Sequence, residues 1–168
     1  AVAVAFLGGE GPQDARSADH VSLWQGTIGD WSDPANWDTP SAPGTFPTNG
    51  GATYDAILSN GGSITLDLDV VIEKLDFSSG TILGGFNLTL NDSLTWTGGV
   101  MEGTGTTTVA GAGSSITGAG FTGLDRTLRN TGTMIYSAVD SSVLNFGATN
   151  VTPGVLINEG RFTVTAGG

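Results

Sequence analysis

The chain has 168 residues, enough for one domain with a buried core, and it carries 16 acidic against 5 basic residues, a formal net charge of −11. This charge disfavours nucleic acid and anionic membrane surfaces as partners, because both would repel the protein. The lack of cysteine excludes disulfides and a cysteine nucleophile, and no apolar run is long enough to span a membrane. The 28 glycines, the many Ser, Thr and Asn residues and the single lysine indicate an all-β fold.

The first 20 residues are expected to form an N-terminal arm and link. The arm begins with seven apolar residues that alternate small and large side chains, a pattern typical of a β-strand. These residues are Ala1, Val2, Ala3, Val4, Ala5, Phe6 and Leu7. The polar residues 8–20 predict an irregular link, in which the only histidine, His20, is expected to be solvated.

Residues 21–61 predict an irregular Trp/Pro-rich cap. The segment holds Trp24, Trp31 and Trp37 together with four prolines. Proline lacks a backbone donor and fixes φ, so this density prevents long regular elements. Short strands are expected within the cap, the last of them near residues 53–58.

Residues 62–168 contain short β-rich runs separated by Gly, Asn and Asp, with no sustained helical period. The expected strands are 63–68, 71–77, 81–83, 87–90, 93–97, 106–109, 114–117, 133–136, 143–146 and 161–165. Three segment pairs resemble each other: 80–84 and 99–103 at an offset of 19 residues, 93–95 and 115–117 at 22, and 128–134 and 156–162 at 28. Offsets of this size are typical of solenoid coils, so the sequence predicts a parallel β-solenoid, a right-handed β-helix.

Two features of such coils can be assigned to residues. Glycine is expected at the corners, where the backbone needs positive φ. Asn130 and Asn158 occupy equivalent places in the 28-residue repeat and are expected to stack, with their amides bonded along the axis.

A resemblance to a known family is carried by Trp24-Gln25-Gly26 followed by Gly29-Asp30-Trp31-Ser32-Asp33-Pro34-Ala35-Asn36-Trp37. This stretch resembles the W-S-D-P-x-N-W opening of large exported bacterial β-solenoid proteins, including autotransporter-like and sorting-signal-bearing surface proteins. The segments 64–67, 94–99 and 124–133 resemble coils of the same family. The resemblance implies a β-solenoid at a bacterial cell surface or outside the cell, and it implies no catalytic residue. Residues 1–7 are not part of the family pattern.

The cap contains two candidate binding sites, one for Ca²⁺ and one for sugars. The oxygen-bearing side chains of Asp30, Asp33, Asn36 and Asp38 suit Ca²⁺, although their spacing is not that of an EF-hand loop. Local turn formation explains the same residues, so the prediction is no cofactor, with calcium as a weak candidate. The rings of Trp24, Trp31 and Trp37 would stack on sugars in a carbohydrate-binding adhesin, whereas the simpler reading is a small aromatic core that closes the solenoid end.

An enzyme is the weaker alternative. Asp67 and Asp69 are two residues apart, which on a strand gives the separation of a glycosidase carboxylate pair. Neither has a desolvating or cationic neighbour in sequence, and a lyase would need more basic residues than this chain has. An ice-binding solenoid is disfavoured, because residues 106–108 form a single threonine cluster.

The ends of the solenoid carry the functional prediction. The cap closes one end, and nothing comparable follows the expected strand at 161–165, which places Phe162 and Val164 at an open coil. An open coil that accepts the arm or the cap of the next subunit would build a filament of head-to-tail copies. The sequence therefore predicts a non-enzymatic extracellular structural protein. The alternative is that the chain is one piece of a longer protein.

Overall fold

The computed structural model describes residues 17–117, 121–138, 144–147 and 153–166. In these ranges the protein has fifteen strands, one 3-10 turn, η1 (Pro34–Asn36), and no α-helix. The strands are β1 (His20–Trp24), β2 (Ile28–Asp30), β3 (Trp37–Asp38), β4 (Tyr54–Leu58), β5 (Ser63–Thr65), β6 (Val70–Phe77), β7 (Thr81–Leu83), β8 (Leu88–Trp96), β9 (Gly99–Val109), β10 (Ser114–Thr117), β11 (Thr122–Asn130), β12 (Thr133–Ala138), β13 (Leu144–Phe146), β14 (Val155–Asn158) and β15 (Arg161–Ala166).

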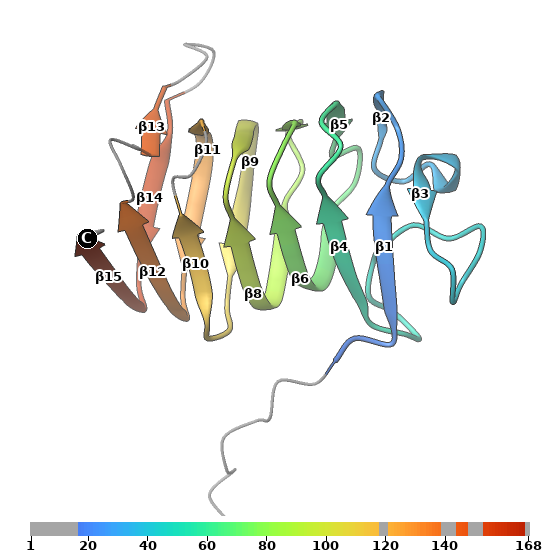
Figure 1. Ribbon diagram of the computed structural model, residues 1–168, viewed down its shortest axis with the longest axis horizontal. Coiled ribbons are helices and arrows are strands. Elements are labelled where there is room, and N and C mark those ends of the chain that lie inside the picture. Colours follow the sequence, from blue (N-terminus) through green and yellow to red (C-terminus); the bar gives the residue numbers. More distant parts are fainter. Residues whose placement is uncertain (1–16, 118–120, 139–143, 148–152, 167–168) are drawn as a thin grey trace, which may run out of the picture.

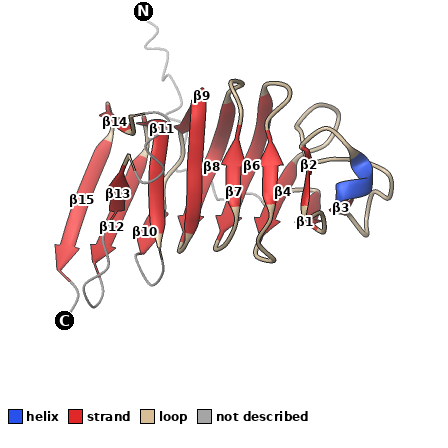
Figure 2. Ribbon diagram, turned by 90° about the horizontal axis from the view of Figure 1, so that it is seen from above, coloured by secondary structure: helices blue, strands red, loops and turns tan. Residues whose placement is uncertain are grey.

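All fifteen strands join one curled, mostly parallel sheet with the shape of a half-barrel (Figures 1 and 2). The predicted all-β class is thereby confirmed, and the closed right-handed solenoid stays a prediction. Within the described ranges, no helix has the length and apolar character needed to cross a lipid bilayer.

The parallel pairings fall into three series. The first runs through β1, β4, β6, β8, β10, β12 and β15, which lie side by side in Figure 1. The second runs through β2, β5, β7, β9, β11 and β13. The third joins the first halves of β6 and β8 to the second halves of β9 and β11 and then to β14. The described exception to parallel pairing is β3, which is antiparallel to β1.

The register confirms two of the three predicted repeats. Ile82 pairs with Met101 at an offset of 19, and Leu128 pairs with Leu156 at an offset of 28. The offset of 22 is wrong, because Ile116 pairs with Trp96 and not with Leu94. A slip of two residues keeps the same side chains on the inner face, so the local similarity could not separate the two registers.

Several strand boundaries differ from the prediction. The expected strand 63–68 ends at Thr65, and 87–90 and 93–97 are one strand, β8, whose pairing with β6 has a register shift. Strands β11 and β14 were not expected. In β11 the buried Asp125 and Arg126 interrupt the alternation that normally identifies a strand.

The core lies inside the curl and consists of the inward residues of all three series. Those that are at most 1% exposed include Leu58, Ile64, Ile72, Leu75, Phe77, Ile82, Leu88, Leu94, Trp96, Met101, Val109, Ile116, Leu124, Leu128 and Met134. The predicted glycine corner is also present. Gly80 has φ 103°, and a Cβ there would lie 2.7 Å from the carbonyl oxygen of Gly62 on the neighbouring strand's turn.

The irregular cap is narrower than the predicted 21–61. Residues 20–24 and 54–58 are β1 and β4, which belong to the first parallel series. His20 starts β1 and is not in a solvated link: its Nδ1 lies 2.8 Å from Ser41 Oγ, and its ring lies 5.0 Å from that of Tyr54. The loops between β2 and β4 therefore form the cap proper.

Candidate functional site

The two ends of the sheet differ in how their strands are covered. At the N-terminal end, β3 pairs with β1, and the loop of the cap reaches the third series through Asn49 N–H, which donates to the carbonyl oxygen of Val71 (2.6 Å). At the other end, β15 pairs only with β12, and β13 and β14 pair only with β11, among the strands described. One backbone edge of each of these three strands is therefore open.

Residues paired on neighbouring strands differ in exposure at the open end, because no described strand covers the last strands. Leu124 is fully buried, whereas Phe146, its partner on the last strand of the second series, is 52% exposed. Val164, on β15, is 65% exposed and pairs with Tyr136, which packs against the core. Each inner residue is buried by the strand that follows it, so a further set of strands would bury the last ones in the same way.

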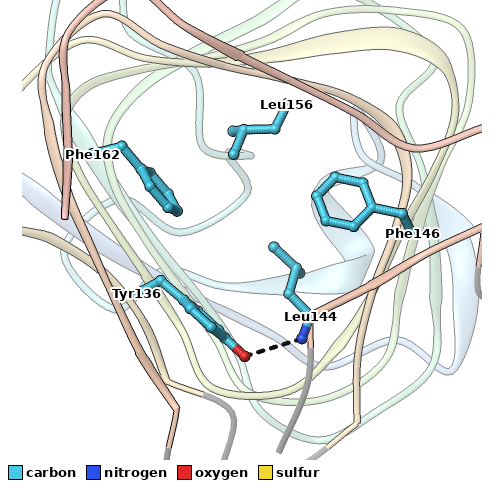
Figure 3. Close-up of a pocket in the computed structure, with 5 residues that line it drawn as sticks. All are labelled: Tyr136, Leu144, Phe146, Leu156 and Phe162. Carbon is cyan, nitrogen blue, oxygen red and sulfur yellow. Dashed lines mark hydrogen bonds between the residues drawn. The ribbon is translucent and has the colours of Figure 1, made fainter. Parts of the chain in front are cut away.

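The open end contains an apolar hollow of about 280 Å³. Figure 3 shows the five side chains that line it converging from different strands. They are Tyr136, Leu144, Phe146, Leu156 and Phe162. The Tyr136 hydroxyl, the one polar side-chain group of this lining, accepts a hydrogen bond from Leu144 N–H (3.2 Å). The hollow therefore suits an apolar side chain.

The predicted asparagine stack lies at the same end and is confirmed. Asn130 Nδ2 donates to Asn158 Oδ1 (2.7 Å) and to the carbonyl oxygen of Arg161 (3.1 Å). Asn158 Nδ2 donates in turn to the carbonyl oxygen of Gly160 (3.1 Å). The amides thus fix the corner between β14 and β15 and set the height of the last strands along the axis.

Of the predicted assembly residues, the structure places Phe162 in the hollow and Val164 on the exposed inner face beside it. The arm residues Ala1, Val2, Ala3, Val4, Ala5, Phe6 and Leu7 lie outside the described residues. Tyr136, Leu144, Phe146 and Leu156 were not predicted as site residues. The 28-residue repeat could have identified Leu156, because it aligns that residue with the core residue Leu128.

The three tryptophans form the closed end. Trp24, Trp31 and Trp37 are 2%, 0% and 6% exposed, and the Trp31 and Trp37 rings meet edge to face at 4.7 Å. Trp31 Nε1 donates to the carbonyl oxygen of Pro47 (2.8 Å), which ties the proline loop over the core. Because the rings are buried, they offer no free face for stacking on a sugar.

Two of the four candidate calcium ligands use their side chains in local structure. Asp33 Oδ1 accepts from Ala35 N–H (2.9 Å) as the cap of η1, and Asn36 Nδ2 donates to the carbonyl oxygen of Asp30 (3.1 Å). Asp38 is exposed on β3. No group of three or more His, Cys, Asp or Glu side chains suited to a metal ion occurs in the part of the chain that the structure describes. The hydrogen bonds of Asp33 and Asn36 fit the turn-forming explanation of these two residues.

The two carboxylates Asp67 and Asp69 likewise accept hydrogen bonds from other parts of the protein. Asp67 accepts hydrogen bonds from the backbone N–H and the hydroxyl of Ser32, and Asp69 accepts from Asn87 N–H (2.8 Å). They lie in the connection between β5 and β6, not on one strand face. Each joins neighbouring turns of the chain, so they do not form a carboxylate pair that faces a common substrate.

No protein-family model, curated protein or solved structure matches this chain. The resemblance of the Trp24–Trp37 region to exported bacterial surface proteins therefore stays a prediction. The open edge at β13–β15, with its apolar hollow, is the candidate functional surface.

Proposed function

We propose that the protein is a non-enzymatic, extracellular structural module that assembles head to tail through the open edge of β13, β14 and β15. The observation that carries the proposal is the exposure of Phe146 and Val164, whose neighbours on the preceding strands are covered. A bacterial cell surface, implied by the family resemblance, is the proposed location.

Strand β15 lacks the devices that normally prevent strand addition at an exposed edge. Natural proteins protect exposed edges with proline, inward charges or very short strands. β15 is six residues long, contains no proline, and carries its one charge at its first residue, Arg161. The other end of the sheet has such protection: β3 has two residues and is followed by the proline loop. The two ends are thus unlike, and a contact between unlike surfaces propagates without closing.

The proposed occupant of the edge is the arm, residues 1–7, of the next subunit. In a strand parallel to β15, the alternation of the arm would place Val2, Val4 and Phe6 on the inner face, next to Phe162 and Val164. The alanines between them would face outward. The arm therefore supplies apolar side chains at the spacing that the hollow requires.

A closed right-handed β-solenoid is proposed as the finer fold. It is supported by the three parallel series, whose inward residues form one core. Right-handed connection between parallel strands is the nearly universal choice. In such a filament the strands lie across the axis, so fibre diffraction is expected to give an axial reflection at about 4.7–4.8 Å.

The assembly is tested with the purified full chain by light scattering and negative-stain electron microscopy over a range of concentrations. The expected result is filaments or a concentration-dependent ladder of oligomers. Deletion of residues 1–9 and the substitution Val164→Asp should each abolish them, because the first removes the donor strand and the second places a charge in the apolar contact. Val71→Asp is the matched control, since Val71 is exposed on the outer face of a middle strand.

A stable monomer at high concentration, with a mass unchanged by either alteration, would overturn the proposal. So would a native polypeptide with further coils after residue 168, because those coils would cover the same edge. The tryptophan adhesin and the polysaccharide-degrading enzyme have no comparable support: the rings are buried, and the two carboxylates are held by Ser32 and Asn87.

A further inference from the structure

A polar groove lies on the side of the molecule, on the outer face of the third parallel series. It has a volume of about 480 Å³ and crosses β8, β9, β11 and β14. Its lining consists of Asn87, Thr89, Thr106, Thr108, Thr127, Arg129, Ile157 and Glu159. Four hydroxyls thus meet in one hollow on the outer face of the sheet.

The register arranges the lining in two rows that run from strand to strand. Thr106 pairs with Thr127 in one row, and Thr89, Thr108 and Arg129 follow one another in the other. Neighbours within a row are separated by the strand spacing of about 4.8 Å, and the rows by the two-residue step of about 6.6 Å. The groove is therefore a regular grid of hydroxyl groups.

Several polar groups of this grid are able to form further hydrogen bonds. In the described part of the chain, the hydroxyls of Thr89, Thr106, Thr108 and Thr127 have no hydrogen-bond partner. Asn87 Oδ1 accepts from Thr106 N–H (3.0 Å), and the Nδ2 of the same amide has no protein partner there. Each hydroxyl both donates and accepts, so the set matches a ligand that is itself rich in hydroxyls.

The charge in the groove is balanced. Arg129 donates from Nε (3.0 Å) and Nη2 (2.7 Å) to Glu159 Oε2, and these are the only charged residues that line the groove in the described structure. A neutral ligand is therefore favoured over an anionic one, which the net charge of −11 would repel. The methyl groups of the threonines and the side chain of Ile157 give apolar contact between the polar groups.

We infer that this groove binds a short stretch of a neutral, extended polysaccharide. The sugars would run along the row direction, because an extended polysaccharide advances per sugar by a distance close to the strand spacing. Four strands span about 14 Å, which accommodates a few sugars. The groove reaches β14, one strand of the open edge, but it lies on the outer face, whereas the proposed assembly contact uses the inner face and the backbone edge. The inference therefore goes beyond the assembly proposed above and does not depend on it.

Affinity electrophoresis and titration calorimetry test the inference with soluble mixed-linkage β-glucan, xyloglucan, galactomannan and dextran as neutral probes, and with polygalacturonate and alginate as acidic ones. At least one neutral polysaccharide is expected to bind, and the acidic ones are not. The double substitution Thr106→Val/Thr108→Val removes two hydroxyls and keeps the β-branched shape. It should weaken binding about tenfold or more.

Thr95→Val is the matched control, because Thr95 is exposed on β8 and lies outside the groove lining. It should bind as the wild type does, and all variants should show the same thermal unfolding midpoint. The inference is overturned if no neutral polysaccharide binds, if the double substitution binds normally, or if the acidic polysaccharides bind as tightly as the neutral ones. Val164→Asp should leave this binding unchanged, which separates it from failure of the assembly.

Discussion

At the scale of single residues, the close approach of neighbouring turns of the chain leaves no space for a side chain at some glycines. Gly80 combines φ 103° with a neighbouring carbonyl oxygen 2.7 Å from where its Cβ would lie. The obstacle is backbone and cannot rotate away. Glycine is therefore required at this corner by both conformation and space.

Gly80→Ala is expected to lower the free energy of unfolding by about 2 kcal/mol or more, because alanine disfavours this φ and meets the carbonyl of Gly62. Urea denaturation followed by circular dichroism measures the change. Gly51→Ala is the control: nothing lies within 4 Å of its Cβ position, and its effect should stay within about 0.5 kcal/mol. Equal effects at the two positions would refute this account of the corner.

Asp55 makes stability depend on pH. Burial raises the pKa of this carboxyl above 3.8, and the attraction of Lys74 offsets only part of the shift. The native state then binds the proton more tightly than the unfolded state does. The stability that this group contributes is present below the unfolded pKa and is lost as pH rises through the raised folded pKa.

Asp55→Asn should therefore gain stability relative to the wild type as pH rises from about 3.5 to 7, because the amide cannot ionise. Denaturation midpoints measured at several pH values test this. Asp38→Asn, in an exposed position on β3, is the control for the loss of one negative charge. A difference between Asp55→Asn and wild type that does not change with pH would contradict the assignment.

At the scale of elements, the cap is a small aromatic core that covers the N-terminal end of the sheet. Trp31 is fully buried, bonds Pro47 through Nε1 and contacts the ring of Trp37. These contacts hold an irregular segment in place where proline prevents a sheet from forming. The cap is thus stabilised by side chains, whereas the rest of the molecule is stabilised mainly by strand pairing.

Trp31→Ala is expected to destabilise the protein by about 3–5 kcal/mol, since it removes a fully buried indole. Trp31→Phe should cost less, because it keeps an aromatic ring and loses the hydrogen bond to Pro47. Chemical denaturation distinguishes the two. If Trp31→Ala left stability unchanged while it abolished sugar binding, the ring would be a binding residue after all.

At the scale of the whole molecule, each strand of a parallel series pairs only with the strands on either side of it, so stability should vary along the sheet. The inner residues of β6 and β8 are fully or almost fully buried, whereas the inner residues Phe146 of β13 and Val164 of β15 are exposed. The open end is therefore the part of the sheet that a partner can stabilise most.

Hydrogen exchange measured by mass spectrometry should show strong protection of β6, β8 and β9 in the monomer and faster exchange of β14 and β15. In filaments, the exchange of β14 and β15 should slow, because a new strand covers their free edge. Val164→Asp should keep the monomer pattern at every concentration. Uniform protection along the chain in the monomer would argue against an open, weakly held end.

The sequence alone determined the all-β class, the repeats at 19 and 28 residues, the asparagine stack and the glycine corner. All of these follow from local spacing, because strand alternation and turn-forming residues are patterns among residues close together in the sequence. It also identified Phe162 and Val164 as residues of the last strand, because that strand has a clear alternating pattern.

Only the tertiary structure decided the rest. A register slip of two residues leaves every side chain on the same face of the sheet. The pairing of Ile116 with Trp96 is therefore visible only once the strands are paired in the structure. The hollow at the open end and the threonine groove gather side chains from four strands each, and a linear pattern does not show which strands are neighbours. The burial of the three tryptophans is likewise a property of the folded cap, because the same residues in sequence suit either a core or a sugar platform.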